Sequence, residues 1–198
     1  GVGDKAFCAG ADLTEGTGTF TRGSAGTTTD FGRLARVARG LRCPIIARVN
    51  GACVAGGMGL MALCDLAVAA DHARFGLPEA KVGVFPMQVL VYLRSMMAPR
   101  HLHELCLTGD LISAERAWQM GLVNAVVPSD ELDQKVADLA ARISACSPMA
   151  LERGRAVLAE MQGMGFHEAL SYAEAQIALA SASDDAREGI SAFNERRS

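Results

Sequence analysis

The chain has 198 residues, of which 50% are hydrophobic and 21% charged, a balance that predicts one compact domain with a sizeable core and a small helical appendage. The formal charge of −3 gives no general attraction to phosphate backbones, which argues against nucleic-acid binding. No apolar run reaches the ~18 residues of a membrane span, and the start G-V-G-D-K lacks a signal-peptide pattern, so we expect a soluble, cytoplasmic protein without a membrane partner.

The first part of the chain begins abruptly and then passes through a long polar stretch. Residues 1–5 predict a turn that leads into a short strand at 6–8, but nothing before this run could supply partner strands. We therefore expect a fold whose N-terminal strands are missing. Residues 14–30 are rich in Gly and Thr and too long for a simple connector, which is typical of a lid or a disordered segment. The run G-S-A-G at 23–26 lacks the G-x-S-x-G spacing of a nucleophile elbow.

Strands and helices then alternate, which predicts an α/β fold. Apolar spacing predicts a helix over 31–41, and Pro44 ends it. Runs rich in Val, Ile and Ala predict strands over 45–50 and 65–71, and a short extended piece follows at 73–76.

The stretch N-G-A-C-V-A-G-G-M-G-L-M-A-L-C-D at 50–65 opens an apolar helix on glycines, each of which costs about 1 kcal/mol relative to alanine inside a helix. Gly56, Gly57 and Gly59 therefore indicate that side chains would be in the way at this part of the helix. Two interpretations stay open at this point: a helix N-terminus that a carbonyl or an anion approaches closely, or close packing of the helix on a neighbouring strand.

From Pro86 onward the pattern is mostly helical, with one strand predicted at 124–127. Ser113, Ser129 and Ser147 are predicted N-caps, the last because proline follows it at the first helical position. The predicted helices cover residues 87–97, 99–107, 113–120, 130–145 and 148–161, and two more lie within 165–197.

Neither the cysteines nor the histidines predict a metal site. Six cysteines are scattered without a C-x-x-C pair, which argues against a zinc module and a disulfide framework and favours thiols in the core. His101 and His103 are two residues apart, so on a helix they point away from each other.

Five segments, in order and at compatible spacing, carry a resemblance to a known family. They are D-K-A-F-C-A-G-A-D-L at 4–13, N-G-x-x-x-x-G-G-x-x-L-x-x-x-C-D at 50–65, F-G-x-P-E at 75–79, T-G-x-x-I-x-A-x-x-A-x-x-x-G-L-V-N-x-V-V-P at 108–128, and E-G-x-x-A-F-x-E-R-R at 188–197. Through them almost the whole chain resembles the crotonase, or enoyl-CoA hydratase/isomerase, superfamily.

The resemblance implies an α/β fold, a spiral of strand-strand-helix turns with C-terminal helices that mediate trimer formation. It divides the chain into a spiral core at 1–128, which would hold the acyl-CoA site, and a helical region at 129–198. It also implies a homotrimer or a hexamer built from two trimers. Coenzyme A is part of the substrate in this family, so no separate cofactor and no metal is expected.

The motifs further imply an oxyanion hole for the thioester oxygen, formed by the backbone amides of Ala11 and Gly56. Such amides stabilise the negative charge that develops on this oxygen, by about 3 kcal/mol for each donor. Residues implied at the coenzyme A end are Lys5, Ala9, Asp12, Leu13, Phe193 and Arg196. Independently of the resemblance, Asp12 is predicted to cap the turn that follows it, and Asp65 is predicted to have a similar structural role.

Hydratases of this family use two glutamates, which fall at positions 59 and 79 of this chain. Glu79 is present and is the expected acid/base, whereas position 59 is Gly59. The segment P-M-Q-V at 86–89 replaces a glycine-rich run, so Met87 and Gln88 are expected to line the acyl pocket. The resemblance implies a hydratase-like lyase acting on 2-enoyl-CoA. Two alternatives stay open: a Δ3,Δ2-enoyl-CoA isomerase, which a single glutamate also fits, and a catalytically weak acyl-CoA-binding protein.

Overall fold

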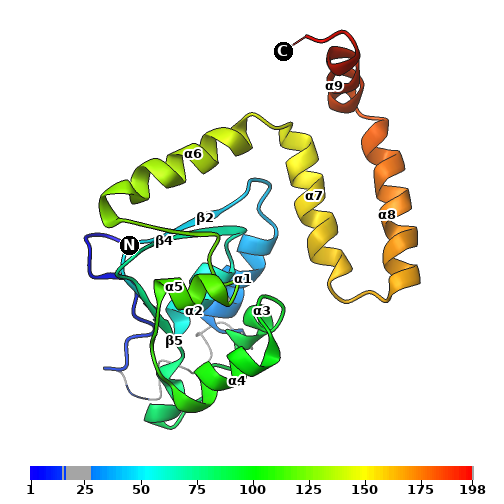
Figure 1. The fold of residues 1–198 in the computed structure, drawn as a ribbon. Coiled ribbons are helices and arrows are strands. Elements are labelled where there is room, and N and C mark those ends of the chain that lie inside the picture. Colours follow the sequence, from blue (N-terminus) through cyan, green and yellow to red (C-terminus); the bar gives the residue numbers. More distant parts are fainter. Residues whose placement is uncertain (15, 17–27, 198) are drawn as a thin grey trace. The chain divides into compact units, whose positions relative to one another are not determined.

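The computed structural model describes residues 1–14, 16 and 28–197, in two compact units (Figure 1). The first unit comprises residues 1–38 and 45–140, and the second comprises 39–44 and 141–198. Most of the polar stretch predicted as a lid or disordered segment, including the whole G-S-A-G run, lies outside the described residues.

A sheet with the strand order β1-β3-β5-β6 positions the candidate site. Strands β1 (Ala6–Cys8), β3 (Ala52–Val54) and β5 (Arg74–Gly76) are mutually parallel, and β6 (Ile112–Ser113) pairs antiparallel with β5. Cys53 in the middle strand is paired with Cys8 on one side and Phe75 on the other. The three parallel strands therefore end at the same edge of the sheet.

A second sheet has the order β2-β4-β7, and all of its pairings are parallel. Its strands are β2 (Ile46–Val49), β4 (Leu66–Ala70) and β7 (Ala125–Val127). Val68 and Ala70 are fully buried, and they pack against Leu132 at the start of the helix that follows β7. These strands confirm the predictions at 45–50, 65–71 and 124–127, each shortened by one or two residues at its ends.

Several helices begin in the first unit. They are α1 (Asp30–Arg39), α2 (Gly56–Ala62), α3 (Leu90–Leu93), α4 (Pro99–Thr108), α5 (Ala114–Gln119) and α6 (Leu132–Ser144), with the 3₁₀ helices η2 (Pro78–Val82) and η3 (Ser129–Glu131). Among them, α2 and α5 contact the strands of these sheets. Ser113 accepts a hydrogen bond from the Arg116 amide at 3.1 Å, which confirms it as the N-cap of α5.

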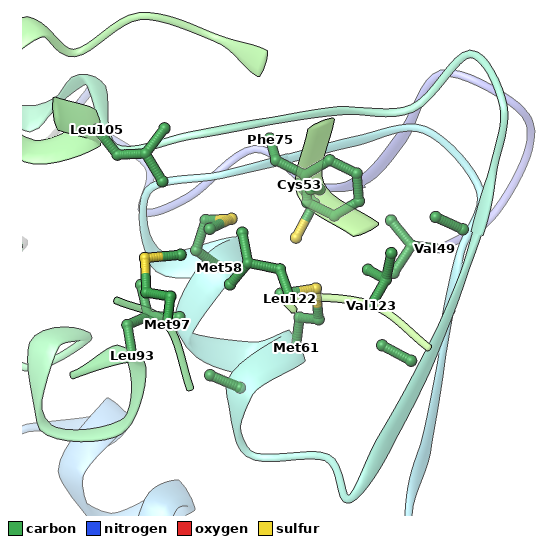
Figure 2. Packing of buried hydrophobic residues seen from close by; sticks show 14 of the residues in the cluster. Val49, Cys53, Met58, Met61, Phe75, Leu93, Met97, Leu105, Leu122 and Val123 are labelled. Carbon is green, nitrogen blue, oxygen red and sulfur yellow. The ribbon is translucent and has the colours of Figure 1, made fainter. Parts of the chain in front are cut away.

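The main core lies where α2 meets the strands. Figure 2 shows Met58 and Met61 of α2 among Cys53 and Phe75 of the first sheet and Val49 of the second. All five side chains are at most 2% exposed. Two predicted core thiols, Cys53 and Cys106, are buried, Cys8 and Cys64 are partly buried, and Cys43 and Cys146 are exposed.

Three sequence predictions are corrected by the structure. The helix expected over 87–97 is reduced to Leu90–Leu93. The amides of Ser95 and Met96 bond to the third carbonyl back, and the Ser95 hydroxyl donates to the Tyr92 carbonyl at 2.8 Å. Strand β3 was not expected. Ser129 does not cap α6, since η3 intervenes and the Ser129 hydroxyl lies 3.3 Å from Nδ1 of His72.

The second unit consists of α7 (Pro148–Met161), α8 (Phe166–Ser181) and α9 (Asp184–Asn194), with the segment 39–44 beside α7. Helices α7 and α8 run antiparallel (Figure 1). Ser147 caps α7 as predicted, by accepting a hydrogen bond from the Ala150 amide at 3.2 Å. None of the described side chains on these three helices is buried. No helix in the described part of the chain is long and apolar enough to cross a membrane.

Candidate active site

Three short segments meet where the parallel strands of the first sheet end. Residues 9–11 follow β1, residues 55–56 follow β3, and residues 77–79 follow β5. Because β1, β3 and β5 are adjacent and parallel, their carboxyl ends lie side by side, which is where open α/β sheets bind ligands. Ala11, Gly56 and Glu79 all belong to these segments.

The turns after β1 and β3 touch each other. A Cβ atom placed on Gly10 would lie 2.9 Å from Cβ of Ala55 and 3.5 Å from the amide nitrogen of Gly56. A Cβ placed on Gly56 would lie 3.7 Å from Cα of Gly10 and 3.9 Å from the amide nitrogen of Ala11. A Cβ at position 56 would therefore make ordinary van der Waals contact with the turn after β1, and the three atoms nearest to it all belong to the main chain of Gly10 and Ala11.

Both turns use backbone conformations that L-residues with side chains rarely adopt. Gly10 has φ +99°, which glycine tolerates. Ala55 has φ 51° and ψ −124°, a strained conformation for a residue with a Cβ atom. The Ala55 amide donates to the carbonyl of Gly76 at 3.0 Å and the Ala55 carbonyl accepts from the Met58 amide at 2.9 Å, so hydrogen bonds hold the residue on both sides.

The three glycines Gly56, Gly57 and Gly59 of α2 have different surroundings. A Cβ on Gly57 would lie only 2.2 Å from the carbonyl oxygen of Cys8, so Gly57 allows α2 to pack on β1. A Cβ on Gly59 would lie 2.6 Å from the ring of Phe31. Around Gly56, by contrast, the contacts of an added Cβ would be of ordinary length. Close packing therefore explains Gly57 and Gly59, and only Gly56 is left for the close approach of a ligand.

Glu79 lies on the 3₁₀ helix η2, directly after Pro78, which occupies the first turn. Its side chain is partly buried, and Oε2 is fully buried without a hydrogen-bond partner among the described residues. Burial raises the pKa of the carboxyl group above its usual value, although a hydrogen bond from its own backbone amide lowers it in part. A carboxylate whose pKa is raised in this way accepts a proton more readily than an ordinary surface glutamate, which suits it to acid/base work.

Neighbouring residues hold the Glu79 segment in place. The Glu79 carbonyl accepts a hydrogen bond from the Val84 amide at 3.1 Å, and Nζ of Lys81 donates to Asp110 at 2.8 Å. Helix η2 packs against α4, whose Cys106 is buried. Burial, together with the nearby charge of Glu79, raises the pKa of the Cys106 thiol to about 11. The thiol therefore stays protonated and inert.

Met87 and Gln88, the two residues expected in the acyl pocket, are both exposed on the first unit. Met87 is 68% exposed. Gln88 is also exposed, and its Nε2 donates to the Thr29 hydroxyl at 2.6 Å. Gln88 thus bonds to the residue that precedes α1, and its role toward a substrate stays a prediction.

Residues predicted at the coenzyme A end divide between the two units. Ala9, Asp12 and Leu13 are exposed and flank Ala11. Asp12 accepts a hydrogen bond from the Thr14 amide at 2.9 Å, which lowers the pKa of the carboxyl group and confirms the predicted turn cap. Asp65 likewise accepts from the Ile45 amide, at 2.7 Å. Lys5 is exposed in the first unit, whereas Phe193, 83% exposed, and Arg196 belong to the second.

Comparison with known proteins decides the family. The enoyl-CoA hydratase/isomerase family model matches residues 1–198. The chain belongs to this family. Its enoyl-CoA hydratase/isomerase relatives include crotonyl-CoA hydratase of Syntrophomonas wolfei, which is 34% identical over 100% of this chain and 76% of its own length. Another is 2,3-dehydroadipyl-CoA hydratase of Escherichia coli, 33% identical over 96% of this chain and 74% of its own length.

Similar solved structures agree with this assignment. DspI of Pseudomonas aeruginosa superposes with a TM-score of 0.88 at 29% identity, over 100% of this chain and 76% of DspI. An enoyl-CoA hydratase of Mycobacterium smegmatis superposes with a TM-score of 0.86 at 32% identity, over 98% and 76% respectively. The fold is therefore crotonase-like, an α/β core followed by a helical region, as the sequence predicts.

Proposed function

We propose that this chain is an enoyl-CoA hydratase that adds water to a 2-enoyl-CoA thioester, with Ala11 and Gly56 as oxyanion donors and Glu79 as the general acid/base. One observation carries the proposal: the segments that contain these residues meet at the carboxyl ends of three adjacent parallel strands. The hydratase names of relatives such as crotonyl-CoA hydratase support the same reaction.

The two amides would act on the thioester carbonyl. When water adds to C3 of the conjugated thioester, electrons move through C2 to the carbonyl oxygen, which becomes an enolate oxygen. Donors that already point at this oxygen stabilise its charge by about 3 kcal/mol each. The main-chain surroundings of Gly56 support this role: the atoms nearest to an added Cβ there are all backbone, so the thioester can lie directly against the main chain.

Glu79 would carry out both proton transfers of the addition. Its carboxylate takes a proton from water as the oxygen bonds to C3, and the resulting carboxylic acid then gives a proton to C2 as the enolate collapses. A single carboxylate can serve both steps because the proton it gains is the proton it returns. The buried, unpartnered Oε2 and the raised pKa of Glu79 support this assignment.

A second candidate reaction is the isomerisation of a 3-enoyl-CoA to its conjugated 2-enoyl isomer. Here Glu79 would remove a proton from C2 and deliver it to C4, while the same amides hold the enolate oxygen. Gly59 favours this alternative, because the position at which hydratases of the family carry a second glutamate has no side chain. The substrate supplies coenzyme A in both reactions, so neither requires a separate cofactor.

The test is the ultraviolet absorbance of the conjugated thioester, followed with a 2-enoyl-CoA and separately with a 3-enoyl-CoA. Loss of absorbance from the first substrate means hydration, and a gain from the second means isomerisation. Glu79→Gln should abolish either change, whereas Glu131→Gln, a matched substitution on the exposed 3₁₀ helix η3, should not. No change with either substrate, in protein that still binds coenzyme A, would favour the acyl-CoA-binding alternative.

A further inference from the structure

The space above Gly59 is filled by a residue from a distant part of the chain. A Cβ atom on Gly59 would lie 2.6 Å from Cζ and 2.9 Å from Cε2 of Phe31, and 3.0 Å from Cγ2 of Val89. The tip of the Phe31 ring therefore rests on the bare backbone of α2. Gly59 itself is buried, and these apolar atoms cover the helix surface at this point.

This contact lies close to the proposed oxyanion hole. Gly59 follows Gly56 by three residues on α2, so both lie on the same side of the helix and about 4.5 Å apart along its axis. If the Gly56 amide binds the thioester oxygen, as the proposed function requires, an acyl group that extends along this face of α2 meets Phe31 and Val89 within the next turn.

Hydrogen bonds brace the residues on either side of the ring. Thr29 caps α1, because its hydroxyl accepts from the Gly32 amide at 3.0 Å, and the same hydroxyl accepts from Nε2 of Gln88 at 2.6 Å. Thr29 thereby joins the start of α1, which carries Phe31, to the segment that carries Val89. The hydrogen bonds of Thr29 therefore fix the segments that carry Phe31 and Val89 relative to each other.

We infer that Phe31 is a specificity-determining residue, which with Val89 forms an apolar wall across the acyl path along α2. The inference rests on the proposed function for the direction of the acyl chain. Such a wall favours a short hydrocarbon acyl group. A long chain collides with the ring, and a carboxylate placed against it loses hydration without gaining a partner from either side chain.

The first experiment compares Phe31→Ala with Val37→Ala, a truncation at an exposed position of the same helix. The quantity is the ratio of kcat/KM for a ten-carbon 2-enoyl-CoA to that for crotonyl-CoA. Phe31→Ala should raise this ratio by about tenfold or more, since each methylene accommodated in an apolar pocket changes kcat/KM by that order. Val37→Ala should leave it unchanged. A ratio that Phe31→Ala does not move overturns the inference while leaving the hydratase proposal intact.

A second experiment measures the contact itself, independently of turnover. Gly59→Ala should lower Tm in the unchanged chain, by about 5 °C, because the new methyl group displaces the ring. In the Phe31→Ala background the same substitution should no longer lower Tm, because alanine is otherwise preferred to glycine inside a helix. Equal effects of Gly59→Ala in both backgrounds would show that Phe31 does not occupy this space, and would overturn the inference.

If the unchanged chain turns over no enoyl thioester, the proposed function fails, and dissociation constants of butyryl-CoA and decanoyl-CoA replace the kinetic ratio. Phe31→Ala should then strengthen decanoyl-CoA binding relative to butyryl-CoA by about tenfold. An unchanged relative affinity, or no binding of either thioester, overturns the inference as well.

Discussion

The backbone amide of Ala55 donates a hydrogen bond to the carbonyl oxygen of Gly76 at 3.0 Å, immediately beyond the paired residues Val54 and Gly76 of β3 and β5. This bond joins the turn that precedes Gly56 to the segment that leads into Glu79. Any change in the conformation of Ala55 therefore disturbs both parts of the proposed site at once.

The conformation of Ala55 leads to the first prediction. Ala55→Gly should retain activity and stability, because glycine adopts φ 51° without strain. Ala55→Val should lower the free energy of unfolding by about 1–3 kcal/mol and reduce kcat at least tenfold, because a β-branched residue resists positive φ. Steady-state kinetics and denaturant unfolding measure the two effects. Ala182→Val, at an exposed residue with φ −81°, serves as the control. Equal stability and activity of Ala55→Val and the unchanged chain would contradict the prediction.

Glu79 leads to a prediction about catalysis. Replacement of the carboxylate by the neutral amide in Glu79→Gln removes the proton acceptor while keeping the shape of the side chain. We expect the turnover rate to fall by about 10²–10⁴-fold, the usual contribution of a positioned acid/base group. Full activity in this variant would assign the proton transfer to another residue.

The same variant tests how burial of Glu79 affects stability. Burial raises the carboxyl pKa in the folded chain above its value in the unfolded chain. The neutral form is thus favoured by folding, and its stabilisation is present below the unfolded pKa and lost as the pH rises through the folded pKa. Glu79→Gln should therefore raise Tm relative to the unchanged chain at about pH 8 and have little effect at about pH 4. A larger effect at the acidic pH would mean that the pKa shift has the opposite sign.

Two helical glycines should respond in opposite ways to alanine. In Gly57→Ala the new Cβ meets the carbonyl oxygen of Cys8, a backbone atom that cannot turn aside, so we expect a loss of about 1–3 kcal/mol or more. In Gly154→Ala, on α7, the new Cβ meets nothing within 4 Å, so the better helix propensity should stabilise the chain by about 0.5–1 kcal/mol. Thermal unfolding of both variants measures the contrast, and stabilisation by Gly57→Ala would refute the packing of α2 on β1.

The helical unit is expected to assemble with further copies of the chain. Four of its large apolar side chains are 67–83% exposed: Leu158, Phe166, Ile177 and Phe193. Exposed apolar side chains of this size are typical of interfaces between protein chains, and we propose that a closed trimer or a pair of trimers covers them. We expect sedimentation to show such an assembly, and Phe166→Asp to weaken it more than His167→Asp, which adds the same charge at the next residue. A chain that remains monomeric at high concentration would contradict this expectation.

How far the sequence predicts the fold depends on how local each signal is. The strands at 46–49 and 66–70 and the caps at Ser113 and Ser147 were predictable, because apolar runs and capping side chains act within a few residues. Strand β3 was missed because three residues before a glycine-rich helix carry almost no periodic signal, and its extended conformation depends on pairing with β1 and β5.

The same limit applies to the candidate site. The positions of Ala11, Gly56 and Glu79 came from family motifs, and strand order explains why the segments that contain them meet. The glycine pattern could not separate Gly57, which packs on Cys8, from Gly59, which packs on Phe31, since both contacts join residues far apart in the chain. Nothing in the segment around Phe31 signals its contact with α2.

The place of β3 between β1 and β5 also has a consequence for how the molecule acquires its activity during folding. The three segments of the proposed site come together only after β3 has found both neighbours, and these pairings join distant parts of the chain, which makes them slow relative to helix formation. Helical circular dichroism should therefore recover before turnover in a refolding experiment. The recovery of turnover would then report when the central strand pairs with both neighbours, a step that spectroscopic probes of helices do not detect.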